Sequence, residues 1–135
     1  MKLHHGKFLA FIIAILLFIP LHYAFAEEIM PYADPEFKEA FISFYSDGEA
    51  DFECVTYEQK SSLYVRSCQL QRKSGSSWIN VGSATTGPTR SNASAYVHTV
   101  DYSSKITTAG VYRVKGTFVA DGYTKTKYSA ERTFN

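Results

Sequence analysis

Short segments in which apolar and polar residues alternate constrain this chain more than any other feature. In residues 50–58, Phe52 and Cys54 alternate with Asp51 and Glu53, so an extended segment there has one apolar face and one acidic face. Six further candidate strands, separated by turn-forming residues, are 40–45, 63–72, 78–81, 95–102, 111–120 and 124–134. Seven short strands within about 100 residues predict an all-β chain, a seven-stranded immunoglobulin-like or fibronectin III-like β-sandwich. Residues 35–41 fit either one helical turn or an early strand.

A tyrosine near the start of the sixth predicted strand supports the sandwich. Within residues 109–114, Tyr112 is followed two positions later by Val114. Immunoglobulin-like domains place a tyrosine at this corner, where its hydroxyl group bonds back to the backbone a few residues upstream. Val114 stands where antibody domains have a cysteine, so any disulfide must join other strands.

The turn between the last two predicted strands decides which side chains share a face. A two-residue turn at Asp121 and Gly122 would pair Phe118 with Lys125 and place that lysine on the inner face. A three-residue turn, with the glycine in the left-handed conformation, keeps the lysines of the last strand on the outer face. We therefore predict the bulged three-residue turn.

The first 26 residues have the layout of a secretory signal peptide. Lys2 and Lys7 precede an apolar run over residues 8–19, which is shorter than the about 20 apolar residues of a membrane-spanning helix. The Ala-Phe-Ala sequence that follows matches a signal peptidase site and predicts cleavage after Ala26. We expect a lead-in segment at 27–39, a sandwich domain at 40–135, and a protein that is secreted, either extracellular or loosely associated with the cell wall.

Export changes the interpretation of the two cysteines, Cys54 and Cys68. An even pair of cysteines in an oxidising compartment favours a disulfide over a catalytic thiol or a metal site. Such a bridge would join the second and third predicted strands and close a loop of about 15 residues, which stabilises a fold by about 3 kcal/mol.

Three segments of the chain resemble a group of known sequences. They are Leu-Gln-Arg-Lys-Ser-Gly-Ser-Ser-Trp at 70–78, Thr-Ala-Gly-Val-Tyr-Arg-Val at 108–114 and Pro-Tyr-Ala at 31–33. Together they resemble small uncharacterised secreted proteins of Gram-positive bacteria of the Firmicutes, which consist of a signal peptide and one β-sandwich. The resemblance implies the fold and a bacterial source, and it implies no activity. The two cysteines and the acidic second strand depart from that group.

Catalytic motifs are absent from the sequence after Ala26. Its single histidine, His98, lies within an alternating strand, where a packing role is more common than that of a general base. Carboxylates recur at every second residue from Asp47 to Glu53, which indicates a solvated outer face, since a single row of carboxylates seldom encloses a calcium ion. We expect no enzymatic activity, no metal and no cofactor.

Charge is distributed unevenly along the chain after Ala26. Residues 27–58 contain ten acidic side chains against Lys38 alone, whereas residues 59–135 contain eleven basic and three acidic ones. With the bulged turn, basic side chains of the last two strands share one outer face. The resulting candidate binding patch consists of Tyr123, Arg113, Lys115, Lys125 and Lys127. Like charges on facing strands are unfavourable, so we expect acidic strands, of the same or another molecule, or an anionic ligand to compensate this patch.

Two classes of function fit these features. The first is a secreted, non-enzymatic binding module of the cell envelope or medium, with a protein, a glycan or an anionic wall polymer as partner. The second is a structural protein that self-assembles, in a salt-sensitive manner, through its complementary acidic and basic faces. The small patch and near-neutral charge argue against nucleic acid, and we expect no stable membrane insertion after cleavage. Aromatic residues available for sugar stacking are Tyr64, Tyr96, Tyr102, Tyr123 and Trp78.

Overall fold

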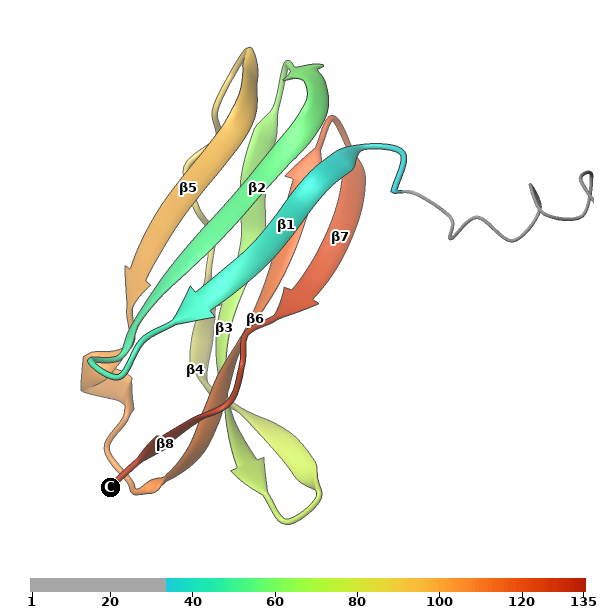
Figure 1. Ribbon diagram of the computed structural model, residues 1–135. Coiled ribbons are helices and arrows are strands. Elements are labelled where there is room, and N and C mark those ends of the chain that lie inside the picture. The colour runs from blue at the N-terminus through green and yellow to red at the C-terminus, as the bar shows by residue number, and fades with distance from the viewer. Residues whose placement is uncertain (1–33) are drawn as a thin grey trace, which may run out of the picture. The chain divides into compact units, whose positions relative to one another are not determined.

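The structure, a computed structural model, describes residues 34–135, which form two antiparallel β-sheets packed face to face (Figure 1). The described strands are β1 (Phe37–Phe44), β2 (Glu49–Lys60), β3 (Leu63–Ser74), β4 (Ser77–Thr85), β5 (Ala93–Asp101), β6 (Gly110–Ala120), β7 (Tyr123–Tyr128) and β8 (Arg132–Phe134). A single 3-10 turn, η1 (Ser103–Lys105), follows β5. The prediction of an all-β chain is confirmed, and the two layers are consistent with a β-sandwich.

The three-stranded sheet has the order β1-β2-β5, and the five-stranded sheet has the order β4-β3-β6-β7, with β8 also paired to β6. The described region therefore has eight strands rather than the predicted seven, because the last predicted strand is interrupted at Ser129. The backbone N–H of Ser129 donates to the carbonyl of Val114, and its Oγ accepts from the N–H of Val114. This contact ends β7 and lets the chain resume along the other end of β6 as β8.

Inward-facing side chains of both sheets form one apolar core. Phe52 of β2 and Phe118 of β6 are fully buried, and their ring centroids lie 6.5 Å apart. Packing between the sheets is close at Gly116, where an added Cβ would lie 2.8 Å from side-chain atoms of Ile42 and Phe52. Burial of each large apolar side chain contributes about 1.5–3 kcal/mol, so this interior is the main source of stability.

The tyrosine corner expected from the sequence is present. The hydroxyl group of Tyr112 donates a 2.7 Å hydrogen bond to the carbonyl oxygen of Thr108, four residues upstream. Val114, two residues further along β6, is fully buried in the core. The prediction of both roles is confirmed.

The prediction of a three-residue turn between β6 and β7 is wrong. The strand register leaves Asp121 and Gly122 as a two-residue turn, with φ angles of 46° and 87°. Asp tolerates this left-handed conformation better than most residues. The Asp121 carboxylate also accepts hydrogen bonds from the Ser61 hydroxyl group at 2.7 Å and the Ser62 N–H at 2.8 Å. These hydrogen bonds connect the turn to the β2–β3 turn. They stabilise the two-residue turn through residues far away in the sequence, which the local pattern does not reveal.

The predicted disulfide is not formed. Cys54 lies on β2 and Cys68 on β3, as expected, but both are free and buried thiols. The two strands belong to different sheets, and facing sheets usually stand about 10 Å apart. A disulfide usually needs its two Cα atoms within about 7 Å of each other. Burial raises the pKa of the Cys54 thiol to about 12 and that of the Cys68 thiol to about 11.

The sandwich begins earlier than the sequence suggested. β1 starts at Phe37, so residues 37–39, expected in the lead-in, belong to the sheet, and the alternative of a helical turn there is not realised. The Asp34 carboxylate accepts hydrogen bonds from the N–H groups of Glu36 at 3.0 Å and Phe37 at 2.8 Å, which directs the chain into the strand. The predicted signal peptide and the cleavage site after Ala26 lie outside the described residues.

Candidate functional site

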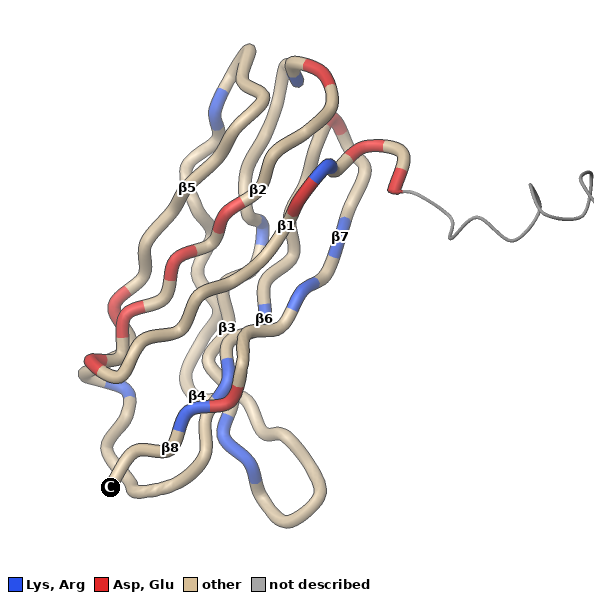
Figure 2. Tube along the Cα trace, viewed as in Figure 1, with Lys and Arg blue, Asp and Glu red and all other residues tan. Residues whose placement is uncertain are grey.

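Acidic residues follow β2 of the three-stranded sheet, and basic residues occur on the strands of the five-stranded sheet (Figure 2). Strand alternation turns one set of side chains outward on the three-stranded sheet, and we call its acidic members the acidic face: Glu39, Glu49, Asp51, Glu53 and Asp101. On the outer side of the five-stranded sheet lies a second set, which we call the cationic surface: Lys73, Trp78, Arg113, Lys115 and Tyr128. The acidic and basic residues that are separated along the sequence are thus also separated in the fold, on the outer faces of different sheets.

The guanidinium group of Arg113 is flanked by two aromatic rings. Its central carbon lies 4.2 Å from the ring centroid of Trp78 and 4.3 Å from that of Tyr128, and each such cation–π contact contributes about 0.5–1 kcal/mol at an exposed site. The Arg113 Nε donates a 2.9 Å hydrogen bond to Oε1 of Gln71, whose Nε2 donates in turn to Oδ1 of Asn80 at 3.0 Å. No carboxylate in the described part of the chain forms an ion pair with Arg113.

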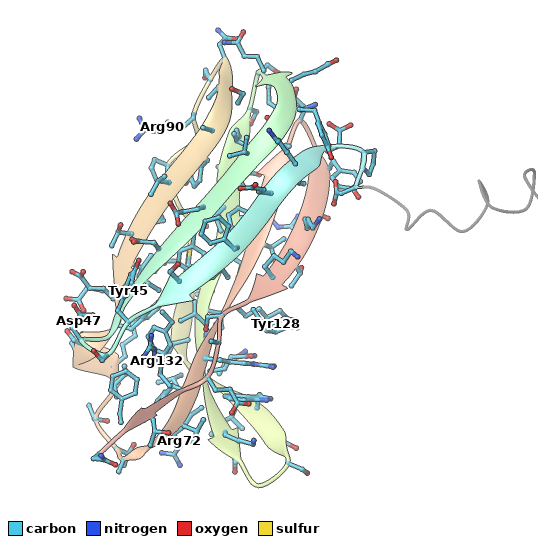
Figure 3. All side chains as sticks on the ribbon, in the orientation of Figure 1. Tyr45, Asp47, Arg72, Arg90, Tyr128 and Arg132 are labelled. Atoms are coloured by element: carbon cyan, nitrogen blue, oxygen red, sulfur yellow. The ribbon has the colours of Figure 1, made fainter. Side chains whose placement is uncertain are left out.

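Four neighbouring strands bring these residues together. The register places Trp78 of β4 opposite Lys73 of β3, and Arg113 of β6 opposite Gln71 of β3. Tyr128, the last residue of β7, is labelled in Figure 3, and its ring contacts the Arg113 guanidinium group. Because side chains two residues apart on a strand share a face, all of them point away from the core.

Two lysines flank the rings. The Nζ of Lys73 lies 5.8 Å from the Trp78 ring centroid, and the Nζ of Lys115 lies 5.9 Å from that of Tyr128. Lys73 also lies 3.8 Å from the Glu131 carboxylate, but both side chains are about half exposed and such pairs contribute little. The cluster therefore presents N–H donors and positive charge, the groups that bind phosphate or carboxylate oxygens.

The structure divides the patch predicted from the sequence. Arg113 and Lys115 lie on the outer face, as expected. Lys125 is paired with the buried Phe118 across the β6–β7 ladder, so Lys125 and Lys127 point to the opposite side of β7. Tyr123 points to that side as well. The two-residue turn causes this division, because a shift of one residue moves every side chain of β7 to the other face.

The displaced residues seal one edge of the sandwich. Lys125 forms an ion pair with Asp34, and the Tyr123 ring packs at 6.0 Å, centroid to centroid, from the ring of Phe37. Burial acts to raise the pKa of Asp34, but hydrogen bonds from Lys125 and from backbone N–H groups outweigh it and leave that pKa lowered. These contacts join β7 to the start of β1, which gives both residues a structural role.

One member of the row of carboxylates on β2, Asp51, accepts two side-chain hydrogen bonds. Asp51 accepts from the Tyr45 hydroxyl group at 3.0 Å and from the Thr99 hydroxyl group at 2.5 Å. Tyr45 and Asp47 lie at the β1–β2 turn (Figure 3), where the Asp47 carboxylate accepts from the N–H of Glu49. In residues 34–135, no group of three His, Cys, Asp or Glu side chains is arranged to hold a metal ion.

Other residues singled out in the sequence are parts of the interior. Tyr96 and Tyr102 are 2% and 0% exposed, so neither is accessible to a sugar. His98 is half-buried on the inner side of β5, and burial lowers its pKa. Its place matches the packing role expected of it.

The stack of Trp78, Arg113 and Tyr128 was not predicted as a unit. Arg113 was identified as a basic residue of the outer face, and Trp78 as an exposed aromatic one. Their contact depends on the joint register of β4, β3 and β6, which no local pattern specifies. A tryptophan just after a tight turn and an arginine after the corner tyrosine were the only local signals.

The site belongs to the outer face of a two-layered, all-β fold. No protein-family model, curated protein or solved structure matches this chain. Among the described residues, no helix is long and apolar enough to span a membrane.

Proposed function

We propose that this protein is a secreted, non-enzymatic binding module, and that its cationic surface recognises an anionic polymer of the cell envelope. The fold we infer for it is the immunoglobulin-like, fibronectin III-like sandwich. The strand order and the tyrosine corner at Tyr112 support that fold. Secretion, and a source among Gram-positive bacteria, rest on the sequence features described above. N-terminal sequencing of the exported protein tests the first of these, with Glu27 as the expected first residue.

The main support for this proposal is that the Arg113 side chain is held in place but has no carboxylate partner in the described part of the chain. Its guanidinium group is held by Trp78, Tyr128 and Gln71, so little side-chain freedom is left to lose on binding. Within residues 34–135 its charge has no carboxylate partner. A fixed guanidinium group with free N–H donors is suited to bind an oxyanion, and Lys115 adds a second positive charge nearby.

The aromatic rings favour an anionic ligand over a neutral sugar. Trp78 and Tyr128 are already in contact with the Arg113 guanidinium group and lie near Lys73 and Lys115. A sugar ring that stacked on them would compete with these cations. The rings therefore serve to position charge, and the ligand chemistry is that of repeated phosphate or carboxylate groups.

Isothermal titration with long-chain polyphosphate and, separately, with poly-L-glutamate tests this proposal and distinguishes the two anions. We expect binding at about 50 mM salt that weakens at about 200 mM, since each phosphate contacted adds about 0.7–0.9 to the slope of log K against log salt. Arg113→Gln should bind at least about tenfold more weakly, because a hydrogen bond to a charged group contributes about 1.5–3 kcal/mol.

Lys38→Gln is the matched control. It removes the same charge from an exposed position on β1, away from the cationic surface, and should leave binding nearly unchanged. If neither polymer binds at low salt, or if both variants weaken binding equally, the proposal is wrong.

A further inference from the structure

The acidic face of the three-stranded sheet contains a carboxylate set between two exposed apolar side chains. Glu53 of β2 is directly paired with Phe41 of β1 on one side and with Val97 of β5 on the other. Phe41 is 45% exposed and Val97 is 55% exposed. In the described part of the chain, Glu53 has no ion-pair partner. An apolar, acidic, apolar row therefore crosses this face.

The cationic surface carries the complementary arrangement. There, an aromatic, cationic, aromatic row is formed by Trp78, Arg113 and Tyr128. On the acidic face, Phe41 and Val97 are two strands apart, which is about 10 Å. The centroids of the two rings lie 4.2 and 4.3 Å from the guanidinium carbon, so rings on its two sides span a width of the same order. The two rows match in charge, in apolar character and in size.

We propose that a second copy of this chain docks its cationic surface onto the acidic face. Glu53 of one copy pairs with the outer N–H groups of Arg113 of the next, while Phe41 and Val97 pack against the two aromatic rings. The pairing removes both unpartnered charges at once, and a carboxylate with a guanidinium group forms the strongest such hydrogen bonds. This inference uses the surface named in the proposed function but does not depend on polymer binding.

The two surfaces lie on opposite sheets, so the contact is heterologous. A pair of copies keeps one unused surface of each kind, so association continues into a filament or closes into a ring. Three strands at about 4.8 Å and eight residues of β1 at about 3.4 Å give a footprint of roughly 400 Å². Contacts of this size fall among weak, transient ones, so we expect assembly only at high protein concentration and low salt.

Sedimentation velocity of Glu53→Gln, Arg113→Gln and a mixture of the two tests this geometry. At about 20 mM salt the unaltered protein should form species larger than dimers, which dissociate at about 500 mM. Each variant alone should stay monomeric at the concentrations where the unaltered protein assembles. The equimolar mixture should stop at a 1:1 dimer, because only one intact pair of surfaces remains. Glu58→Gln, which removes an exposed acidic group outside the acidic face, should assemble normally.

The outcomes separate this inference from the proposed function. A monomer under every condition, or a mixture that does not pair, overturns the assembly. A discrete dimer that both variants still form indicates a symmetric contact elsewhere and also overturns it. Glu53→Gln keeps the cationic surface, so it should bind polyphosphate as the unaltered protein does. Loss of assembly with retained polymer binding supports both conclusions, and assembly without polymer binding supports this one alone.

Discussion

The imidazole ring of His98 lies 6.4 Å, centroid to centroid, from the ring of Phe52 and is tilted 33° to it. This half-buried position disfavours the charged form, which lowers the pKa of His98. The unfolded chain takes up a proton near the ordinary value of about 6.5, whereas the folded protein does so only at lower pH. Stability is therefore fully present above about pH 6.5 and falls as the pH drops toward the folded pKa.

We expect the urea midpoint to decrease between about pH 7 and pH 5, and His98→Gln to flatten this decrease. Equilibrium unfolding at a series of pH values, with buffer strength held constant, measures the effect. Asp34 and Asp121 have lowered pKa values, so their contribution is present above about pH 4 and is lost only below it. An unchanged slope between pH 7 and 5 in the variant would assign the effect to another group.

Tyr112→Phe should destabilise the protein by about 1–2 kcal/mol, because it removes the bond to the Thr108 carbonyl without changing the shape of the core. Tyr57→Phe is the control, since Tyr57 is 57% exposed and should change stability by less than about 0.5 kcal/mol. Urea unfolding of both variants measures the difference. Equal effects of the two would show that the corner bond contributes nothing.

Gly116→Ala should destabilise the protein by about 1–3 kcal/mol, because its Cβ would lie 2.8 Å from the Cδ1 atom of Ile42 and from the Phe52 ring. Ile42→Val removes one of these atoms at a cost of about 0.5–1.5 kcal/mol. The double variant should therefore lose less stability than the sum of the two single changes. Strict additivity in thermal or urea unfolding would contradict the close contact.

The thiols of Cys54 and Cys68 should be inert in the folded protein and reactive after unfolding. Both are buried, and burial holds their pKa values near 12 and 11, so thiolate is scarce at neutral pH. Labelling with a thiol reagent, without reductant, should detect no thiol in native buffer and two thiols in denaturant. Absence of both thiols in denaturant would show that the sulfur atoms are bonded to each other.

What the sequence could predict was set by local rules. Alternation along β2 correctly placed Phe52 and Cys54 inside and Asp51 and Glu53 outside, because side-chain direction in a strand has a period of two residues. The corner at Tyr112 is also predictable from local sequence, because the hydrogen-bond partner of its hydroxyl group is only four residues away.

What the sequence could not predict depends on residues far apart in the chain. The side of β7 that Lys125 occupies is decided by the turn at Asp121, whose carboxylate binds Ser61, 60 residues earlier. The ion pair of Lys125 with Asp34 spans 91 residues. In isolation, a lysine on an inner face is unfavourable, so the local sequence pattern favours the three-residue turn.

The position of Lys125 and Lys127 also determines how copies of the chain can meet. β7 is an edge strand of the five-stranded sheet. The backbone groups along such an edge can pair with an added strand. An incoming strand would have to enclose two ammonium groups that face the inner side of that edge, which is costly. Pairing of another strand with this edge, the route to cross-β fibrils, is therefore disfavoured. The protein can reach high concentration without forming amyloid through this edge.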